Sequence, residues 1–288
     1  MILGTRSNRI SMAMANQLVK RMSESFPDES VELKIIAGAG ATDGRTTTVN
    51  GTGEYEALVE MLRTGNIDAA AVGADEVPLE QGCWTDVTAI LPRGHVEDVL
   101  VSMMPLERLR PGSVIGISSA RQKCLLLNLR PDLCVKDMRE EANVSLDIGK
   151  GLDGFIVSRA GMELLLIDCP EFGLDPDHFI PAPGQGAVAV LCPNNNRYRK
   201  MLANFDDRGA RLCVESERFL LRSVADDNSV PVGIWVTTDG GDIRIRAMVM
   251  DNDGMTAFRL DRNIELSRLD EGLSAFVKEM KYVWDLVA

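Results

Sequence analysis

Side chains that commonly build metal sites and hydrolytic triads are scarce in this sequence. It contains only two histidines, His95 and His178. Its six cysteines form no Cys-x-x-Cys pair, and none has a histidine at metal-ligand spacing. Because zinc sites and Ser-His-Asp triads depend on such residues, we expect no metal site and no triad of this kind. The cysteines are expected to be reduced and mostly buried: Cys83, Cys124, Cys134, Cys169, Cys192 and Cys213.

Basic residues are also fewer than acidic ones. The chain has 31 Lys and Arg residues against 43 Asp and Glu residues, which gives a net charge of −12. Nonspecific binding of nucleic acid requires clustered Lys and Arg, so we expect no nucleic-acid partner. An anionic membrane surface is disfavoured for the same reason. A small anionic ligand would need a local basic patch within this repulsive field.

Long apolar runs are missing as well. No run approaches the roughly 20 residues that a membrane-spanning helix needs, so we expect no membrane partner. The N-terminal segment is partly apolar, but Arg6, Arg9 and Asn16 interrupt it. A secretory signal has a continuous apolar core, so we expect a cytoplasmic protein. The length of 288 residues fits two or three domains of roughly 100–150 residues each.

The N-terminal part of the chain alternates predicted strands and helices. Apolar runs predict strands at residues 2–4, 31–38 and 67–74. Helical spacing of apolar residues predicts helices at 9–25 and 54–64. The segment 39–53 is rich in Gly and Thr and is expected to be a loop. This strand–helix order favours a parallel sheet with right-handed crossovers.

A second unit of the same kind follows Pro92. Strands are predicted at residues 113–119, 134–138 and 154–158. Helices are predicted at residues 120–129, 141–149 and 159–167. A further strand at 187–192 comes after this unit, and its return to the first sheet would make the first domain discontinuous.

The pattern changes from about Gly209. A strongly amphipathic helix is followed by three segments of alternating polarity, VGIWVTT, DIRIRAMVM and MTAFRLDR, which are separated by Gly-containing turns. They predict an antiparallel three-stranded meander, followed by a helix at about 266–286. We therefore predict an α/β protein with three domains. Their boundaries are 1–92 plus 187–206, then 97–183, then 209–288.

Six segments, in order and at matching spacing, resemble the porphobilinogen deaminase (hydroxymethylbilane synthase) family. They are GTR at 4–6, GNIDAAAVGADEVP at 65–78, EDVLVS at 97–102, GISSARQKCLLLNLRPDLCVKDMR at 116–139, PAPGQGAVAV at 181–190 and ERFLLRSVADDNSVPVG at 217–233. The resemblance implies two periplasmic-binding-protein-like α/β domains around a cleft and a small α/β third domain. The predicted elements agree with that organisation.

The resemblance also implies an activity. The family consists of transferases of tetrapyrrole (porphyrin) biosynthesis, which polymerise four porphobilinogen molecules to hydroxymethylbilane with release of ammonia. A dipyrromethane cofactor, held by a thioether to a cysteine of the third domain, primes the reaction. Arg and Lys side chains bind the many carboxylates, and an Asp assists proton transfer.

The residues that match the family's carboxylate-binding positions are dispersed along the chain. They are Arg6, Ser118, Ser119, Arg121, Arg139 and Gln185. Among them, the two serines precede a predicted helix, whose free N–H groups suit an anion.

Several positions depart from the family pattern. Asn228 stands at the cofactor-attachment cysteine, and an amide cannot form the thioether. Glu76 stands at the catalytic Asp and Asp75 at the preceding Lys; a neighbouring like charge raises the proton affinity of a carboxylate. Three expected cations are replaced by Gln122, Ser145 and Thr52. We therefore expect no covalently bound cofactor, and a noncovalent dipyrromethane is the remaining form.

Three functions stay open at this point. The first is a porphobilinogen deaminase-like protein with a degenerate active site, whose catalytic residue would be Glu76 if it is active. The second is a noncatalytic descendant, a pseudoenzyme that binds a small anionic ligand or a partner in the cleft. The third, a periplasmic-type solute-binding protein, leaves the third domain and the missing signal peptide unexplained. A shared fold does not decide between them.

Overall fold

The computed structural model describes residues 1–36, 52–80, 82, 86–138, 151–165, 170–226 and 230–287, without the side chains of residues 52, 54, 164 and 165. The chain divides into two compact units. The first, unit 1, comprises Met1–Gly94, Glu163–Leu166 and Gly186–Arg211. The second, unit 2, comprises His95–Met162, Ile167–Gln185 and Leu212–Ala288.

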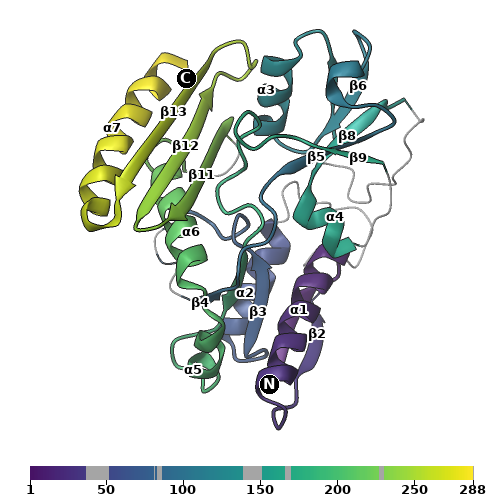
Figure 1. Ribbon diagram of the computed structural model, residues 1–288. Coiled ribbons are helices and arrows are strands. Elements are labelled where there is room, and N and C mark those ends of the chain that lie inside the picture. The colour runs from purple at the N-terminus through teal and green to yellow at the C-terminus, as the bar shows by residue number, and fades with distance from the viewer. Residues whose placement is uncertain are drawn as a thin grey trace. The chain divides into compact units, whose positions relative to one another are not determined.

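Unit 1 contains a five-stranded sheet in the order β2-β1-β3-β10-β4 (Figure 1). Its strands are β1 (Ile2–Arg6), β2 (Glu32–Ile36), β3 (Ala69–Gly73), β4 (Val87–Ile90) and β10 (Val188–Leu191). Strand β1 pairs in parallel with β2 and β3, whereas β10 is antiparallel to both β3 and β4. The predicted parallel arrangement of the first three strands is confirmed, and the strand predicted at 187–192 joins this sheet.

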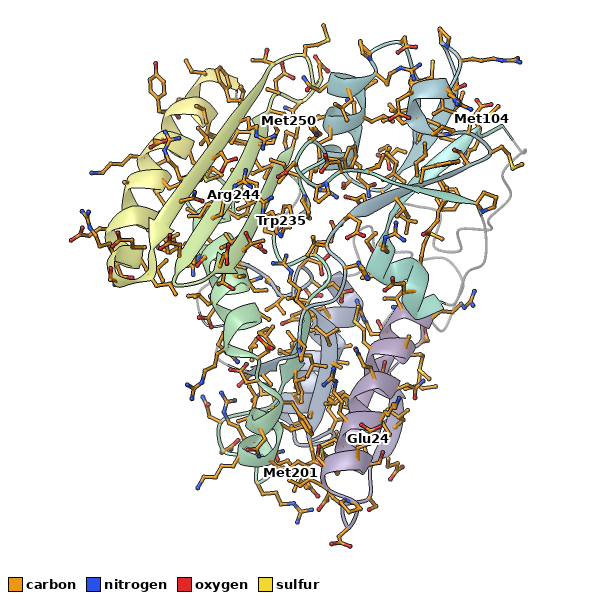
Figure 2. All side chains as sticks on the ribbon, in the orientation of Figure 1. Glu24, Met104, Met201, Trp235, Arg244 and Met250 are labelled. Atoms are coloured by element: carbon orange, nitrogen blue, oxygen red, sulfur yellow. The ribbon has the colours of Figure 1, made fainter. Side chains whose placement is uncertain are left out.

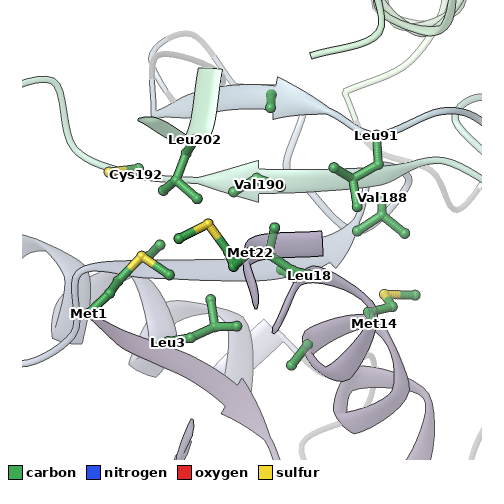
Figure 3. Packing of buried hydrophobic residues seen from close by; sticks show 14 of the residues in the cluster. Met1, Leu3, Met14, Leu18, Met22, Leu91, Val188, Val190, Cys192 and Leu202 are labelled. Carbon is green, nitrogen blue, oxygen red and sulfur yellow. The ribbon is translucent and has the colours of Figure 1, made fainter. Parts of the chain in front are cut away.

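Unit 1 also contains the helices α1 (Arg9–Ser25), α2 (Thr52–Arg63) and α5 (Arg199–Leu202). A 3-10 turn at Ala203–Phe205 follows α5. The Asn8 side chain caps α1 by accepting a hydrogen bond from the Ser11 N–H. Helix α1 buries Leu18 and Met22 against Leu3 of β1 and Val190 of β10 (Figure 3). Each such fully buried apolar side chain contributes about 1.5–3 kcal/mol, so this cluster holds β1 and its C-terminal end in place.

Unit 2 contains a second five-stranded sheet, in the order β7-β6-β8-β5-β9. Its strands are β5 (Asp98–Ser102), β6 (Val114–Ile117), β7 (Cys134–Asp137), β8 (Gly154–Ser158) and β9 (Glu171–Gly173). A 3-10 turn at Leu106–Arg108 and helix α3 (Ala120–Leu129) belong to this part, and α4 (Arg159–Leu165) follows β8. Strand β6 is parallel to β7 and β8, whereas β5 is antiparallel to β8 and β9. Helix α3 follows directly from β6, which places the Ser118–Ser119 turn at the C-terminal end of that strand.

The C-terminal part of unit 2 is an antiparallel meander of β11 (Val232–Asp239), β12 (Asp242–Met250) and β13 (Ala257–Glu265). Helix α6 (Arg208–Leu221) precedes this sheet, and a 3-10 turn (Leu266–Arg268) and α7 (Leu269–Val287) follow it. Trp235, labelled in Figure 2, lies on β11, and the Arg246 guanidinium lies 3.5 Å from its ring centroid. The predicted three-stranded meander and terminal helix are confirmed.

Some features were not found from the sequence pattern. The strands β4, β5 and β9 and the short helix α5 were not predicted. The predicted helix at 141–149 and most of the predicted loop at 39–53 lie outside the described residues. The boundaries of the three predicted domains stay a prediction. Within the described ranges, no helix combines the length and hydropathy that crossing a bilayer would require.

Candidate functional site

A buried arginine and a carboxylate meet at one edge of the unit 1 sheet. Arg6 is the last residue of β1, and Glu76 follows shortly after the end of β3. Because these two strands are parallel neighbours, their C-terminal ends lie at the same edge, where α/β sheets commonly bind ligands. The Arg6 Nη2 donates a hydrogen bond to Glu76 Oε2. The Arg6 side chain is 8% exposed and that of Glu76 is 32% exposed, so Glu76 is the solvent-accessible member of the pair.

Ser11 orients Arg6 from the other side. Its Oγ accepts a hydrogen bond of 3.0 Å from Arg6 Nε, and its backbone N–H is the group capped by Asn8. Ser11 itself is buried. The guanidinium is therefore fixed between the first turn of α1 and Glu76. We did not single out Ser11 from the sequence, although a polar residue on the apolar face of a predicted helix was the available signal.

Glu76 has an unusual proton affinity. Burial raises the pKa of its carboxyl to about 7, and the like charge of Asp75 adds to the rise, while Arg6 and a backbone hydrogen bond oppose it. A Cβ at Gly73 would lie 2.5 Å from Asp75 Oδ1, so a larger residue there would displace the Asp75 carboxylate. A carboxyl group with a pKa near neutrality can both donate and accept a proton under physiological conditions.

The turn before α3 contains the two predicted serines of unit 2. Ser119 is the N-cap of α3, and its Oγ accepts from Gln122 N at 3.1 Å. Gln122 Oε1 accepts two hydrogen bonds from Ser118, one from its N–H at 2.9 Å and one from its Oγ at 3.0 Å. The two Ser118 donors, which the sequence predicted to bind an anion, thus contact the Gln122 side chain.

Arg121 is buried, and its guanidinium points at protein groups. Its Nη2 donates to Asp98 Oδ2 at 2.8 Å and to Gln185 Oε1 at 3.1 Å, and its Nη1 donates to Ile180 O at 2.8 Å. Its Nε has no hydrogen-bond partner among the described residues. The Arg121 Cζ lies 5.7 Å from the centroid of the Phe179 ring. Arg121 therefore ties α3 to β5 and to the segment before β10, and its contact with a ligand stays a prediction.

Gln185 and its neighbours form a tightly held turn. Gln185 Nε2 donates to Val96 O at 2.7 Å, while Gly184 has φ of 81°, a conformation that favours glycine. The Gly184 N–H donates to Glu217 Oε2 at 2.7 Å, and Glu217 Oε1 accepts from Val236 N at 2.9 Å. Glu217 is completely buried. This carboxylate joins the Gly-Gln-Gly turn to α6 and β11.

The predicted site residues therefore fall into two groups. Arg6 and Glu76 contact each other in unit 1. In unit 2, Asp98 links Arg121 to Gln122, and through Gln122 to Ser118. Asp98 was missed in the sequence, where an acid directly before the apolar run Val99–Val101 was its signal. The remaining two predicted positions, Arg139 and Asn228, lie outside the described residues.

Two of the buried thiols are poor nucleophiles. Burial raises the pKa of the Cys124 thiol to about 11 and that of Cys192 to about 12. Since the thiolate is the reactive form, neither offers an alternative attachment point. Cys213, on α6, is also buried. Among the described residues, no group of His, Cys, Asp and Glu has the arrangement of a metal site.

A second group of cations lies at the opposite edge of the unit 1 sheet, beyond the end of β10. It surrounds a shallow cavity of about 540 Å³ lined by Asn194, Asn196, Arg197, Arg199, Lys200 and Ala203. Asn196 Nδ2 donates to Asp68 Oδ1 at 3.2 Å just before β3, which places the cavity at the N-terminal end of that strand. This cavity is separate from Arg6 and Glu76.

Comparisons with known proteins point to one family. The family model described as "Porphobilinogen deaminase, dipyromethane cofactor binding domain" matches residues 1–200. The chain is 28% identical over 282 residues to a probable porphobilinogen deaminase of Thermoplasma acidophilum, covering 96% of this chain and 95% of that protein. It is 30% identical over 260 residues to a probable porphobilinogen deaminase of Nitrosopumilus maritimus, covering 88% and 84% of the two chains.

A bacterial relative gives the same result. The porphobilinogen deaminase of Stenotrophomonas maltophilia is 32% identical over 258 residues, covering 86% of this chain and 84% of that protein. Among solved structures, the methionine binding protein MetQ has a TM-score of 0.40 at 12% identity, covering 71% of this chain and 88% of that chain. That structural likeness is too weak to bear on function.

Proposed function

Because the chain belongs to the porphobilinogen deaminase family, we propose that it binds porphobilinogen, or a carboxylated pyrrole of that class, noncovalently and without polymerising it. The observation that carries the proposal is the amide of Asn228 at the position where the family resemblance places the attachment cysteine. A thioether requires sulfur at that position. Without it, a growing chain of pyrroles has no covalent anchor there.

The residues present do not fit a covalently held dipyrromethane. Besides Asn228, the family's second arginine after the serine turn is Gln122, which is neutral. Arg121 is engaged by the buried Asp98. A charge-assisted hydrogen bond contributes about 1.5–3 kcal/mol, so the loss of several cations removes much of the affinity for a ligand with many carboxylates. We therefore derive no catalytic step through this cofactor.

The Arg6–Glu76 pair supports binding of a smaller anion. Arg6 has a guanidinium that matches a carboxylate in geometry. Protonation of Glu76 would weaken its hold on Arg6 and release the guanidinium to a ligand carboxylate. In this proposal Arg6 binds the ligand, Ser11 orients Arg6, and Glu76 holds or releases a proton according to whether the ligand is present.

A working deaminase is the second candidate, and Glu76 favours it. This residue keeps a carboxyl at the position of the family's catalytic Asp, and its pKa of about 7 suits proton transfer near neutral pH. In that case the primer would be held without a covalent bond. Full-length similarity to porphobilinogen deaminases is compatible with either candidate.

One preparation of the purified chain tests both candidates. We expect the intact mass to equal that of the polypeptide, calorimetry to show saturable binding of porphobilinogen, and the porphobilinogen concentration to stay constant on incubation. A mass increase of a dipyrromethane, or colour with Ehrlich's reagent on the washed protein, would refute noncovalent binding. Consumption of porphobilinogen with formation of uroporphyrin after oxidation would establish the deaminase instead.

Two variants sharpen the result. Glu76→Gln cannot release a proton, so it should abolish any turnover, and it should strengthen porphobilinogen binding at pH 8 because Arg6 no longer faces a carboxylate. Arg197→Ala changes a cation at the opposite edge of the unit 1 sheet. It should leave binding unchanged and controls for a general effect of positive charge. If no porphobilinogen binds to the native chain, the proposed ligand class is wrong.

A further inference from the structure

Gln122 occupies the hydrogen-bond donors of the turn before α3. Its Oε1 lies 2.9 Å from Ser118 N and 3.0 Å from Ser118 Oγ, and accepts from both. These are the distances at which an anion oxygen accepts from a backbone amide and a hydroxyl. Ser118 is exposed to solvent, so without the Gln122 carbonyl its two donors would face water or a dissolved ligand.

The Gln122 side chain is held in place at its other end. Its Nε2 donates to Asp98 Oδ1 at 3.0 Å, and its backbone N–H donates to Ser119 Oγ at 3.1 Å. Asp98 is completely buried, and Gln122 is 5% exposed. Moving the amide away would leave a buried carboxylate oxygen without this donor, which is costly. A ligand therefore cannot displace Gln122 from Ser118 without disturbing Asp98.

The amide group suits this arrangement because it has both an acceptor and a donor. It accepts from Ser118 through its oxygen and donates to Asp98 through its nitrogen. A guanidinium or an ammonium has donors but no acceptor, so an Arg or Lys at this position could bind Asp98 and would leave both Ser118 donors free. The identity of residue 122 thus decides whether the turn is open to an anion.

We propose that Gln122 is a specificity-determining residue that closes the α3 turn to anions. The native chain then binds no ligand carboxylate or other oxyanion at Ser118. This inference goes beyond the proposed function and does not rest on it, because it concerns a turn in unit 2 and makes no use of Arg6 or Glu76.

The test follows the Ser118 and Ser119 backbone amides by NMR during titration with inorganic sulfate. In the native chain, we expect no saturable shift of these two signals. Gln122→Met keeps the side-chain volume but has only a poor acceptor. It should show a saturable sulfate shift at this turn, with an affinity at least about tenfold above the upper limit that the native chain sets, as expected for one regained charge-assisted hydrogen bond. Gln122→Arg should show a gain at least as large.

The control variant removes the released donor. Gln122→Met combined with Ser118→Ala should lose the gain in sulfate binding, and the dispersion of the remaining amide signals reports whether each variant is folded. A saturable sulfate shift at Ser118 in the native chain would overturn the proposal, and this measurement needs no variant. Folded variants at residue 122 that bind no more tightly than the native chain would also overturn it. Porphobilinogen binding at Arg6 is a separate measurement, so either proposal can fail alone.

Discussion

The chain pairs an arginine with an acid in each of its two units, and the two pairs differ in burial. In unit 1, the Arg6 and Glu76 side chains are 8% and 32% exposed. In unit 2, the Arg121 and Asp98 side chains are 5% and 1% exposed, and Asp98 also accepts from Gln122. The first pair has a carboxyl that water and protons can reach. The second is enclosed by its hydrogen-bond partners.

This difference separates a partly accessible pair from an enclosed one. Removing one partner of a buried ion pair leaves an uncompensated charge and costs about 3–5 kcal/mol. A pair at an accessible edge can exchange its partner for water or for a ligand at lower cost. The same two functional groups thus hold α3 in unit 2, and in unit 1 they form the pair at which we propose that a ligand binds.

Asp98→Ala should have the largest effect on stability. It leaves Arg121 buried without its carboxylate and removes the acceptor of Gln122 Nε2, so we expect the free energy of unfolding to fall by about 3–5 kcal/mol. Urea denaturation measures this change. The matched control is Glu271→Ala, which breaks the exposed Arg268–Glu271 pair and should change stability little. Equal losses in the two variants would contradict the structural role of Asp98.

Glu217→Ala should come second. It removes the acceptor of the Gly184 and Val236 N–H groups. Each unsatisfied buried donor costs about 1–3 kcal/mol, and two such losses at one carboxylate do not fully add, so a loss of roughly 2–4 kcal/mol is expected. Glu217→Gln keeps one carbonyl acceptor and should lose less. Urea denaturation of both variants measures these losses of stability. A smaller loss for Glu217→Ala than for Glu217→Gln would contradict the prediction.

Glu76 should make stability depend on pH. Its pKa lies at about 7 in the folded chain against an ordinary value of 4.5. Between these values the folded chain keeps a proton that the unfolded chain has released. The contribution of Glu76 to the free energy of unfolding is therefore full below about pH 4.5 and is lost as pH rises to about 7. The stability of the native chain relative to Glu76→Gln should therefore decline across this window, by on the order of 2 kcal/mol. Parallel urea titrations from pH 5 to pH 8 measure it, and a constant difference would exclude the raised pKa.

Arg6→Ala should mainly affect ligand binding. Loss of the guanidinium removes a charge-assisted contact with a ligand carboxylate, so porphobilinogen affinity should fall by about tenfold or more. Calorimetry at pH 6.5 measures the change. Lys200→Ala, which removes a cation beside the 540 Å³ cavity, should leave the affinity unaltered. An equal loss in both variants would indicate that overall charge, and not the Arg6 position, controls binding.

Local patterns in the sequence were sufficient for most of the elements. The apolar spacing in residues 9–25 predicted α1 with both of its ends, and alternating polarity predicted β11, β12 and β13. These features depend on neighbours within one or two helical turns or on the adjacent strand of a meander. The strands β4 and β5 were missed, although segments of similar length predicted β6, β7 and β10.

The pairing of the site residues was not predictable in the same way. Arg6 and Glu76 were each selected from the sequence, but they are 70 residues apart and meet only because β1 and β3 are parallel neighbours. Ser11, Asp98 and Glu217 were not selected, since each acts through a partner brought close by packing. Arg121 matched a ligand-binding pattern, yet its burial against Asp98 depends on the order of strands in the second sheet.

Side-chain identity and short-range periodicity are enough to predict the long helices, the meander and the chemistry available at each position, including the amide at residue 228. Which acid faces which arginine, and whether each pair is accessible, depends on the folded chain. Burial and charge pairing arise from contacts between distant segments, and these contacts set the pKa of Glu76 and direct the Gln122 carbonyl to Ser118.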